Sequence, residues 1–213
     1  SDPINIRYSQ FTSNLARVIA KSTVAHFIVL GTCAEYGSFT NLSAKSLRRS
    51  TSSNLYSQQK IAALASSREV LQKSTVRFTW ARIFYPFGVS QHKDRLIPHL
   101  IKCVKNGDTI ELADTSSQYD WITTRDIASA ISWIINHPAP TEVDIGTSIG
   151  YTNIELLHHL EALMGLTQQS SQVVSKPQVS SRMNVVAKDS PLFTSGWLPA
   201  DTLNSGLEWV LDS

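Results

Sequence analysis

The 213-residue chain has few cysteines, little net charge and no long apolar run, and each shortage excludes a class of protein. Two cysteines cannot form the framework of a disulfide-rich domain, so Cys33 and Cys103 are expected to be reduced, buried thiols. A formal net charge of +2 argues against a nucleic-acid partner. The chain contains no run of about 18 apolar residues, so no membrane span is predicted. The first residues do not resemble a signal peptide. A cytoplasmic location is therefore expected, and no metal site is predicted.

The hydrophobic pattern predicts alternating helices and strands, because some apolar residues recur at helical spacing and others form short continuous runs. Helices are predicted at residues 5–22, 55–72, 94–104, 125–136, 152–164 and 200–211. Strands are predicted at residues 25–30, 76–84, 109–112, 119–122 and 143–146, with a polar loop at 38–54 and a weakly patterned segment at 167–182. This alternation indicates an α/β fold with a mostly parallel sheet. The short strands beyond residue 88 indicate a smaller lobe at its edge.

Three polar residues near the first predicted strand could carry acid-base chemistry. Thr32 follows Gly31 at the carboxyl end of that strand, where open α/β sheets bind ligands. Tyr56 and Lys60 share one face of the next helix, and a surface tyrosine beside a lysine is the alternative reading of that spacing. A phenol ordinarily ionises at about pH 10, and a nearby ammonium favours the phenolate, which can exchange a proton with an alcohol or carbonyl. A threonine hydroxyl could hydrogen-bond the same oxygen.

The context of these residues is a series of short motifs in a fixed order. The sequence Gly-Thr-Cys-Ala-Glu-Tyr-Gly occupies residues 31–37, and a Tyr-x-x-x-Lys follows about twenty residues later. Further motifs lie at residues 82–88, 95–98, 120–128, 144–147, 196–199 and 206–207. In order and spacing they resemble the extended short-chain dehydrogenases/reductases, the NAD-dependent epimerase/dehydratase family that acts mostly on nucleotide sugars. The resemblance covers essentially the whole chain.

The resemblance implies catalytic and cofactor roles for four residues. Thr32, Tyr56 and Lys60 would be the catalytic residues. Tyr56 and Lys60 would also bind the cofactor, NAD or NADP, with Lys60 bonded to the nicotinamide ribose. Phe84 would lie against the cofactor near the nicotinamide.

The resemblance also implies residues that bind the nucleotide-sugar substrate. Thr32 would contact the sugar, and Tyr85, where the family often has asparagine, would face the sugar nucleotide. Arg95 would approach the nucleotide end, because a guanidinium suits phosphate, although a plain surface arginine fits it equally well. The helices around Leu15 and Ile61 would form a homodimer interface.

The glycine-rich turn that cradles the cofactor pyrophosphate in this family is missing from the chain. Residue 1 aligns just before the helix that precedes the Thr32 strand, so we expect a fragment of a longer gene product, with a truncated natural protein as the alternative. The expected fold is an incomplete Rossmann-type doubly wound parallel sheet with a smaller C-terminal α/β substrate lobe. Residues 1–90 would be the C-terminal part of the NAD(P)-binding domain. Residues 91–213 would mainly form the substrate-binding lobe, with some segments returning to the sheet.

The residues after Thr32 narrow the expected reaction. Family members that dehydrate sugars carry an acidic pair there, whereas this chain has Cys33 and Ala34, which cannot supply an acid and a base to expel water. A 4-keto reductase or an epimerase remains. The segments Gly-Thr-Cys-Ala-Glu-Tyr-Gly and Phe-Tyr-Pro-Phe-Gly resemble those of reductases, so we expect an NAD(P)-dependent oxidoreductase that reduces an NDP-4-keto-6-deoxyhexose at C4. An epimerase resembling UDP-glucose 4-epimerase is one alternative, and a truncated, non-catalytic binding protein of the same fold is another.

Overall fold

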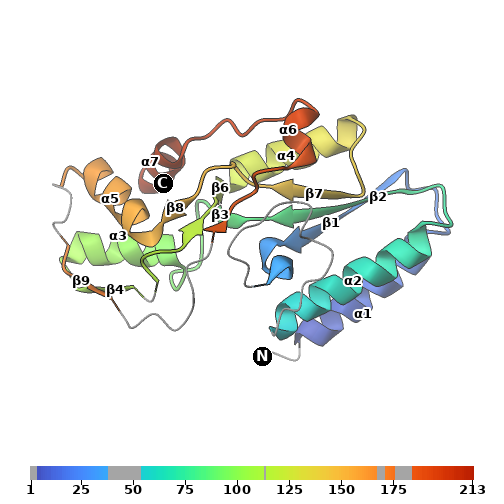
Figure 1. Cartoon of the computed structure of the whole chain (residues 1–213), viewed down its shortest axis with the longest axis horizontal. Coiled ribbons are helices and arrows are strands. Elements are labelled where there is room, and N and C mark those ends of the chain that lie inside the picture. Colours follow the sequence, from blue (N-terminus) through green and yellow to red (C-terminus); the bar gives the residue numbers. More distant parts are fainter. Residues whose placement is uncertain (1–3, 38–53, 113, 167–170, 176–183) are drawn as a thin grey trace.

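A parallel sheet lies at the centre of one half of the molecule (Figure 1). The computed structural model describes residues 4–37, 54–112, 114–166, 171–175 and 184–213. The strands are ordered β1 (His26–Thr32), β2 (Arg77–Ile83) and β7 (Glu142–Ile145), and both pairings are parallel. Their carboxyl ends therefore meet at one edge of the sheet. The loop predicted at residues 38–54 lies outside the described residues except for its last position.

Helices cover both faces of this sheet (Figure 1). On one side lie α1 (Ile4–Ile19) and α2 (Leu55–Leu71), and on the other lie α4 (Thr124–Asn136) and α6 (Pro191–Thr194). Neighbouring side chains of β2 point to opposite faces of the sheet. Trp80 packs on the side of α1 and α2, and Ala81 packs on the side of α4 and α6. The predicted doubly wound arrangement is therefore present.

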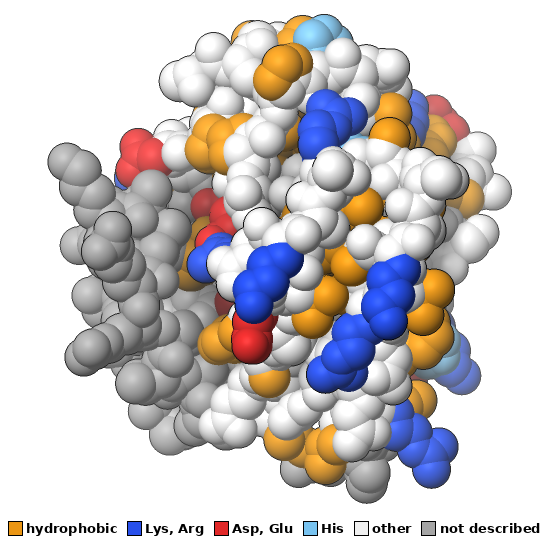
Figure 2. Space-filling model, turned by 90° about the vertical axis from the view of Figure 1, so that its right-hand side faces the viewer, with side chains coloured by type: hydrophobic (Ala, Val, Ile, Leu, Met, Phe, Trp, Pro, Cys, Tyr) orange, Lys and Arg blue, Asp and Glu red, His pale blue; other side chains and the backbone are white. Residues whose placement is uncertain are grey.

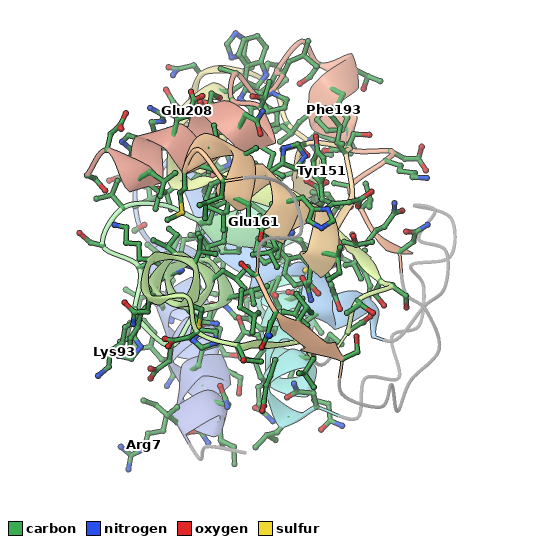
Figure 3. The ribbon with its side chains drawn as sticks, turned by 90° about the vertical axis from the view of Figure 1, so that its left-hand side faces the viewer. Arg7, Lys93, Tyr151, Glu161, Phe193 and Glu208 are labelled. Atoms are coloured by element: carbon green, nitrogen blue, oxygen red, sulfur yellow. The ribbon has the colours of Figure 1, made fainter. Side chains whose placement is uncertain are left out.

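In its described part, the second half of the molecule consists of helices and several short strands around one apolar core (Figures 1 and 3). Its helices are α3 (Leu96–Asn106), α5 (Asn153–Leu163) and α7 (Leu203–Leu211). Its strand pairings are β3 (Tyr85–Phe87) with β6 (Trp121–Thr123), β4 (Ile110–Leu112) with β9 (Val173–Ser175), and β5 (Gln118–Tyr119) with both β8 (Tyr151–Thr152) and β10 (Asn184–Val185). Fully buried side chains of this core include Leu100, Ile110, Leu156, Leu160 and Leu207.

Most element boundaries differ from the prediction by a few residues, and one difference has a clear cause. The strand predicted at 119–122 is divided at Asp120 into β5 and β6. The Asp120 N–H donates to Val185 O, and its carbonyl accepts from Tyr85 N–H, so the backbone changes partners at this residue. Local signals set two helix ends: Thr152 begins α5 with a capping box, and Gly107 ends α3 with a φ of 70°.

The end of the molecule where β1 and β2 begin exposes both basic and hydrophobic side chains (Figure 2). Lysine and arginine side chains alternate there with exposed hydrophobic side chains. None of the helices in the described part of the chain is long and apolar enough to cross a membrane.

Candidate active site

The carboxyl end of β1 places Thr32 on a short turn. β1 runs directly into the 3-10 helix η1 (Cys33–Tyr36), and Thr32 is its N-cap. The Thr32 Oγ1 accepts a hydrogen bond from Ala34 N–H at 3.3 Å, and the Thr32 N–H donates to Glu35 Oε1 at 2.8 Å. In the described part of the chain the Thr32 hydroxyl only accepts, so its own proton is available to a ligand.

Glu35 is a buried carboxylate at the centre of this turn, with 2% of its surface exposed. Trp80 Nε1 donates to both of its oxygens at 3.0 and 3.1 Å, and Arg82 Nε donates to Oε2 at 2.8 Å. The close fit requires Gly31, since a Cβ there would lie 2.1 Å from Trp80 Nε1. Burial raises the pKa of Glu35, while Arg82 and the Thr32 N–H oppose that rise.

Further charged side chains extend the Glu35–Arg82 ion pair across the sheet. Arg82 also forms an ion pair with Glu142 on β7, and Glu142 is in turn paired with Arg68 on α2. The Tyr36 hydroxyl donates to Asp144 Oδ1 at 2.5 Å, and burial raises the pKa of Asp144. The turn after β1 is thus connected to β2 by an ion pair and to β7 by a hydrogen bond to a carboxylate.

Tyr56 lies in the first turn of α2, where 38% of its surface is exposed. The helix begins there because Asn54 is its N-cap, and the Asn54 side chain accepts the Tyr56 N–H at 2.9 Å. The phenol is therefore held by the helix start and remains accessible to a ligand.

Lys60 lies one turn further along α2 and points back to the sheet. Its Nζ donates to Leu30 O of β1 at 2.8 Å, lies 3.9 Å from the centre of the Tyr8 ring, and lies 5.7 Å from the centre of the Tyr56 ring. Burial lowers the pKa of Lys60, and the neighbouring Tyr56 and Glu35 oppose that shift. The predicted Tyr–Lys pair is therefore assembled beside the strand that ends in Thr32.

Phe84 follows β2 and fills the space behind the turn. It is 1% exposed and packs in one cluster with Cys33, Tyr36, Val185 and Ala187. Its N–H donates to Ile145 O at 3.0 Å. These contacts give Phe84 a packing role, and its predicted contact with the nicotinamide stays a prediction.

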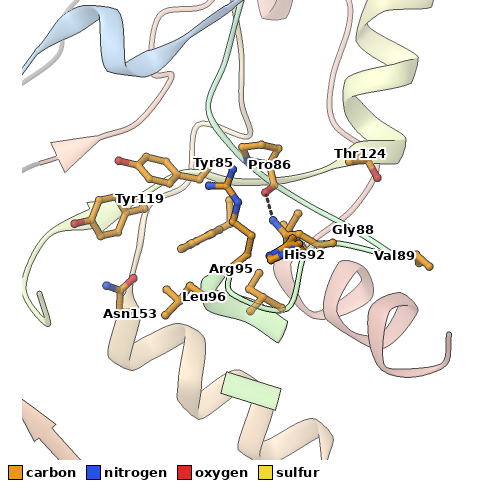
Figure 4. A pocket seen from close by; sticks show the side chains of 14 residues that line it. Tyr85, Pro86, Gly88, Val89, His92, Arg95, Leu96, Tyr119, Thr124 and Asn153 are labelled. Carbon is orange, nitrogen blue, oxygen red and sulfur yellow. Dashed lines mark hydrogen bonds between the residues drawn. The ribbon is translucent and has the colours of Figure 1, made fainter. Parts of the chain in front are cut away.

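A cavity of about 680 Å³ lies beyond the carboxyl end of β2 (Figure 4). Its aromatic wall consists of Tyr85, Tyr119 and Trp121, with the Tyr85 ring centre 4.6 Å from that of Tyr119 and 5.4 Å from that of Trp121. Arg95 begins α3 at the same cavity, and its side chain has no partner among the described residues. Burial raises the pKa of Tyr85, so this phenol is neutral at physiological pH. The cavity thus offers an aromatic wall and one unpaired guanidinium.

Asp114 holds the polar side of the aromatic wall in place. Its Oδ2 accepts from the Tyr119 hydroxyl at 2.9 Å, and its Oδ1 accepts from Ser116 N–H and Ser117 N–H, both at 3.0 Å. Its backbone oxygen accepts from Asn153 Nδ2 at 2.8 Å. Burial alone would raise the pKa of Asp114, but the donors from Ser117, Ser116 and Tyr119 lower it to about 2.

The predicted site residues thus form two groups at the same edge of the sheet. Thr32, Tyr56 and Lys60 surround the end of β1, whereas Tyr85 and Arg95 line the cavity beyond β2. The aromatic cluster around Phe84 lies between the groups, because Tyr85 packs against it. Among the described residues, no cluster of histidine, cysteine and acidic side chains is placed to hold a metal ion.

Sequence reasoning missed the residues that support the two groups. Glu35 and Arg82 are charged residues next to or within buried strand runs, and that placement was the available signal for an internal ion pair. Tyr119, Asp114 and Asn153 offered no local signal, because they come together only through tertiary packing.

Comparison with known proteins identifies the family. Residues 5–146 match the model of the NAD dependent epimerase/dehydratase family, and the chain therefore belongs to that family. A low-salt glycan biosynthesis protein of Haloferax volcanii is 30% identical over 129 residues, which cover 59% of this chain and 41% of that protein. The CDP-abequose synthase of Salmonella typhimurium is 25% identical over 145 residues, which cover 64% and 48% respectively. The chain thus spans about half the length of these relatives or less.

Solved structures confirm the fold. A UDP-glucuronic acid 4-epimerase from Bacillus cereus, in complex with UDP-glucuronic acid and NAD, superimposes with a TM-score of 0.83 at 18% identity, covering 98% of this chain and 66% of that one. A UDP-glucose 4-epimerase from Thermotoga maritima superimposes with a TM-score of 0.82 at 18% identity, covering 98% and 72%. A dTDP-glucose 4,6-dehydratase from Bacillus anthracis gives 0.78 at 20% identity, covering 98% and 66%. The predicted Rossmann-type α/β fold is therefore confirmed.

Acid should remove a stabilising contribution of Asp114. Its pKa of about 2 in the folded state lies below the ordinary value of 3.8. A lowered pKa means that this contribution is present above the ordinary value and is lost as the pH falls through about 2. Between about pH 4 and pH 2 the thermal unfolding midpoint of the wild type should therefore fall more steeply than that of Asp114→Asn. Parallel curves for the two proteins would show that Asp114 makes no such contribution.

Proposed function

We propose that the protein is an NAD(P)-dependent oxidoreductase that reduces the C4 keto group of a nucleotide-linked 4-keto-6-deoxyhexose. The observation that carries this proposal is the assembly of Tyr56 and Lys60 beside the strand that ends in Thr32. The proposal divides the chain into residues 1–90, as the C-terminal part of the NAD(P)-binding domain, and residues 91–213, as mainly the substrate-binding lobe with segments that return to the sheet.

The three side chains have distinct roles in this reaction. When bound, the nicotinamide supplies a hydride to the sugar C4. The Tyr56 phenol donates its proton to the carbonyl oxygen as that oxygen gains charge, so the ketone becomes an alcohol. Lys60 stabilises the resulting phenolate through its positive charge, and the Thr32 hydroxyl donates a hydrogen bond to the same substrate oxygen.

The residues that face the end of β1 fit a nicotinamide ribose. Lys60 has three N–H donors, of which one is bound to Leu30 O, so two remain for ribose hydroxyl groups. Tyr56 is partly exposed on the same helix face. Either NAD or NADP fits these contacts, because both carry the same nicotinamide ribose.

The reductase reaction is favoured over dehydration by the residues that follow Thr32. Cys33 is 7% exposed, and burial raises its pKa to about 12, so its thiol is not a base at neutral pH. Ala34 has no proton to exchange. Epimerisation at C4 uses the same tyrosine and hydride transfer, and it is the second candidate because solved 4-epimerases share the fold.

The cavity beyond β2 suits the nucleotide part of the substrate. Its volume of about 680 Å³ is in the range of small-molecule sites. The Arg95 guanidinium, which points toward the strand end that carries Tyr85 in Figure 4, can pair with a diphosphate. The rings of Tyr85 and Tyr119 offer flat surfaces to a sugar or base.

We also propose that the protein forms a homodimer through α1. Ile4, Phe11 and Val18 are spaced by seven residues, and they are 63%, 66% and 66% exposed. This spacing places them along one side of the helix, which therefore carries an apolar stripe toward solvent. The side of α1 that faces α2 instead buries the small residues Ser9, Thr12 and Ala16.

Tyr56→Phe should abolish turnover without abolishing binding, because only the phenolic hydroxyl group is removed. In the full-length gene product we expect kcat to fall by at least about 100-fold and the substrate Kd to change by less than about threefold. Steady-state kinetics and calorimetry measure the two quantities. Tyr151→Phe, which removes a phenol from β8, is the matched control and should leave kcat unchanged. Retention of kcat in Tyr56→Phe would disprove the proposed role.

Arg95→Ala should weaken substrate binding more than it slows chemistry. Because the guanidinium would bind phosphate in both ground state and transition state, we expect KM to rise by about tenfold with little change in kcat. Lys93→Ala removes a neighbouring exposed charge that does not line the cavity, and it should leave KM unchanged. Equal KM values for Arg95→Ala and the wild type would exclude Arg95 from the substrate site.

Phe11→Glu should dissociate the dimer, because it places a charge within the apolar stripe of α1. Sedimentation velocity should show a dimer for the wild type and a monomer for this variant. Leu198→Glu places the same charge at a residue that is 69% exposed elsewhere, and it should remain dimeric. A monomeric wild type, or a dimeric Phe11→Glu, would contradict the proposed interface.

A further inference from the structure

The capping box at Thr32 is buried, unlike a second capping box in the same molecule. In both boxes a threonine N–H is accepted by the glutamate three residues later, at 2.8 Å for Glu35 and 2.7 Å for Glu155. Glu155 is exposed and begins the long helix α5. Glu35 is 2% exposed, although η1 has only four residues. Capping this short turn therefore does not explain why a carboxylate is buried there.

The partners of Glu35 hold it rigidly. Its two oxygens accept from Trp80 Nε1, Arg82 Nε and Thr32 N–H, at distances between 2.8 and 3.1 Å. Trp80 and Arg82 both belong to β2, the middle strand of the sheet, and Trp80 is fully buried. Glu35 thus connects the backbone of Thr32 to a part of the core that cannot easily move.

Stability alone is a weak reason for such an arrangement. Taking two charges out of water costs free energy that their attraction often fails to exceed, and apolar residues of similar size frequently stabilise a fold as well or better. A buried pair that ends on the backbone of one partly exposed polar residue is better suited to fix that residue in place. Thr32 is the residue so fixed.

We infer that Glu35 is a positioning residue for Thr32, which it orients toward the substrate oxygen through the Thr32 N–H. This inference rests on the proposed function, because it assigns Thr32 to the substrate site. Glu35 does not touch the substrate and transfers no proton. Its effect is to hold the Thr32 hydroxyl in the geometry that the developing charge on the oxygen requires, where small displacements slow catalysis strongly.

A double-mutant cycle in the full-length gene product tests the inference. Glu35→Gln retains the size of the side chain but removes its charge, and it should lower kcat by about tenfold while KM changes by less than about twofold. Thr32→Ala should lower kcat by at least as much. If Glu35 acts through Thr32, the double variant should be no slower than Thr32→Ala alone. Additive effects in the double variant, or an unchanged kcat in folded Glu35→Gln, would overturn the inference.

Asp126→Asn is the matched control for loss of a buried carboxylate. Asp126 is 2% exposed and accepts Ala200 N–H at 2.9 Å and Asp201 N–H at 3.0 Å, on the α4 side of the sheet. Its replacement should lower the unfolding midpoint and leave kcat unchanged. If Glu35→Gln does not fold, Trp80→Phe replaces it, because that change removes the Nε1 donor that orients Glu35 and keeps an aromatic ring, although a smaller one, in the core. Trp80→Phe should lower kcat in the wild type but should cause no further decrease in a protein that already carries Thr32→Ala. A further, additive decrease would contradict the inference.

Hydrogen exchange of the Thr32 amide separates failure of this inference from failure of the proposed function. The amide should exchange at least about tenfold faster in Glu35→Gln than in the wild type, and Asp126→Asn should leave it unchanged. If the wild type turns over no nucleotide sugar, the proposed function fails, and the exchange rates alone decide whether Glu35 fixes Thr32. Equal exchange in Glu35→Gln and the wild type would overturn the positioning role.

Discussion

The ion pair between Glu35 and Arg82 is the constraint on which the rest of the site depends. It joins the turn after β1 to the middle strand of the sheet, and Arg82 extends it to Glu142 on β7. Because both charges are buried, loss of Arg82 would leave Glu35 without its cationic partner, at a cost of about 3–5 kcal/mol. The turn that carries Thr32 is therefore fixed relative to all three strands.

The parallel sheet places this fixed turn beside the other candidate site residues. Its strands all end at one edge, so Thr32 at the end of β1 and Tyr85 after β2 lie at the same side of the molecule. Helix α2 brings Lys60 to that edge, where its ammonium binds the backbone of β1. The packed cluster around Phe84 separates the acid-base group from the cavity that is proposed to bind the nucleotide. In the proposed function, the acid-base group and the substrate cavity therefore lie in adjacent places that are supported by different contacts.

The sequence predicted the parts of the fold that depend on local pattern. The apolar runs located β1 and β2, and the spacing of Tyr56 and Lys60 placed both on one helix. The partners of Glu35 could not be predicted in this way, because Trp80 and Arg82 lie 45 and 47 residues further along the chain. The exposure of the apolar stripe on α1 could not be predicted either, because the spacing of apolar residues does not tell whether they face the protein's own core or a partner.

Isotope transfer tests the proposed reaction most directly. The full-length gene product would be incubated with an NDP-4-keto-6-deoxyhexose and with NADH or NADPH that carries deuterium at the transferable position of the nicotinamide. A reductase should place deuterium at C4 of the product sugar, with one cofactor oxidised for each ketone reduced. Interconversion of C4 epimers without net oxidation of the cofactor would contradict reduction and identify an epimerase.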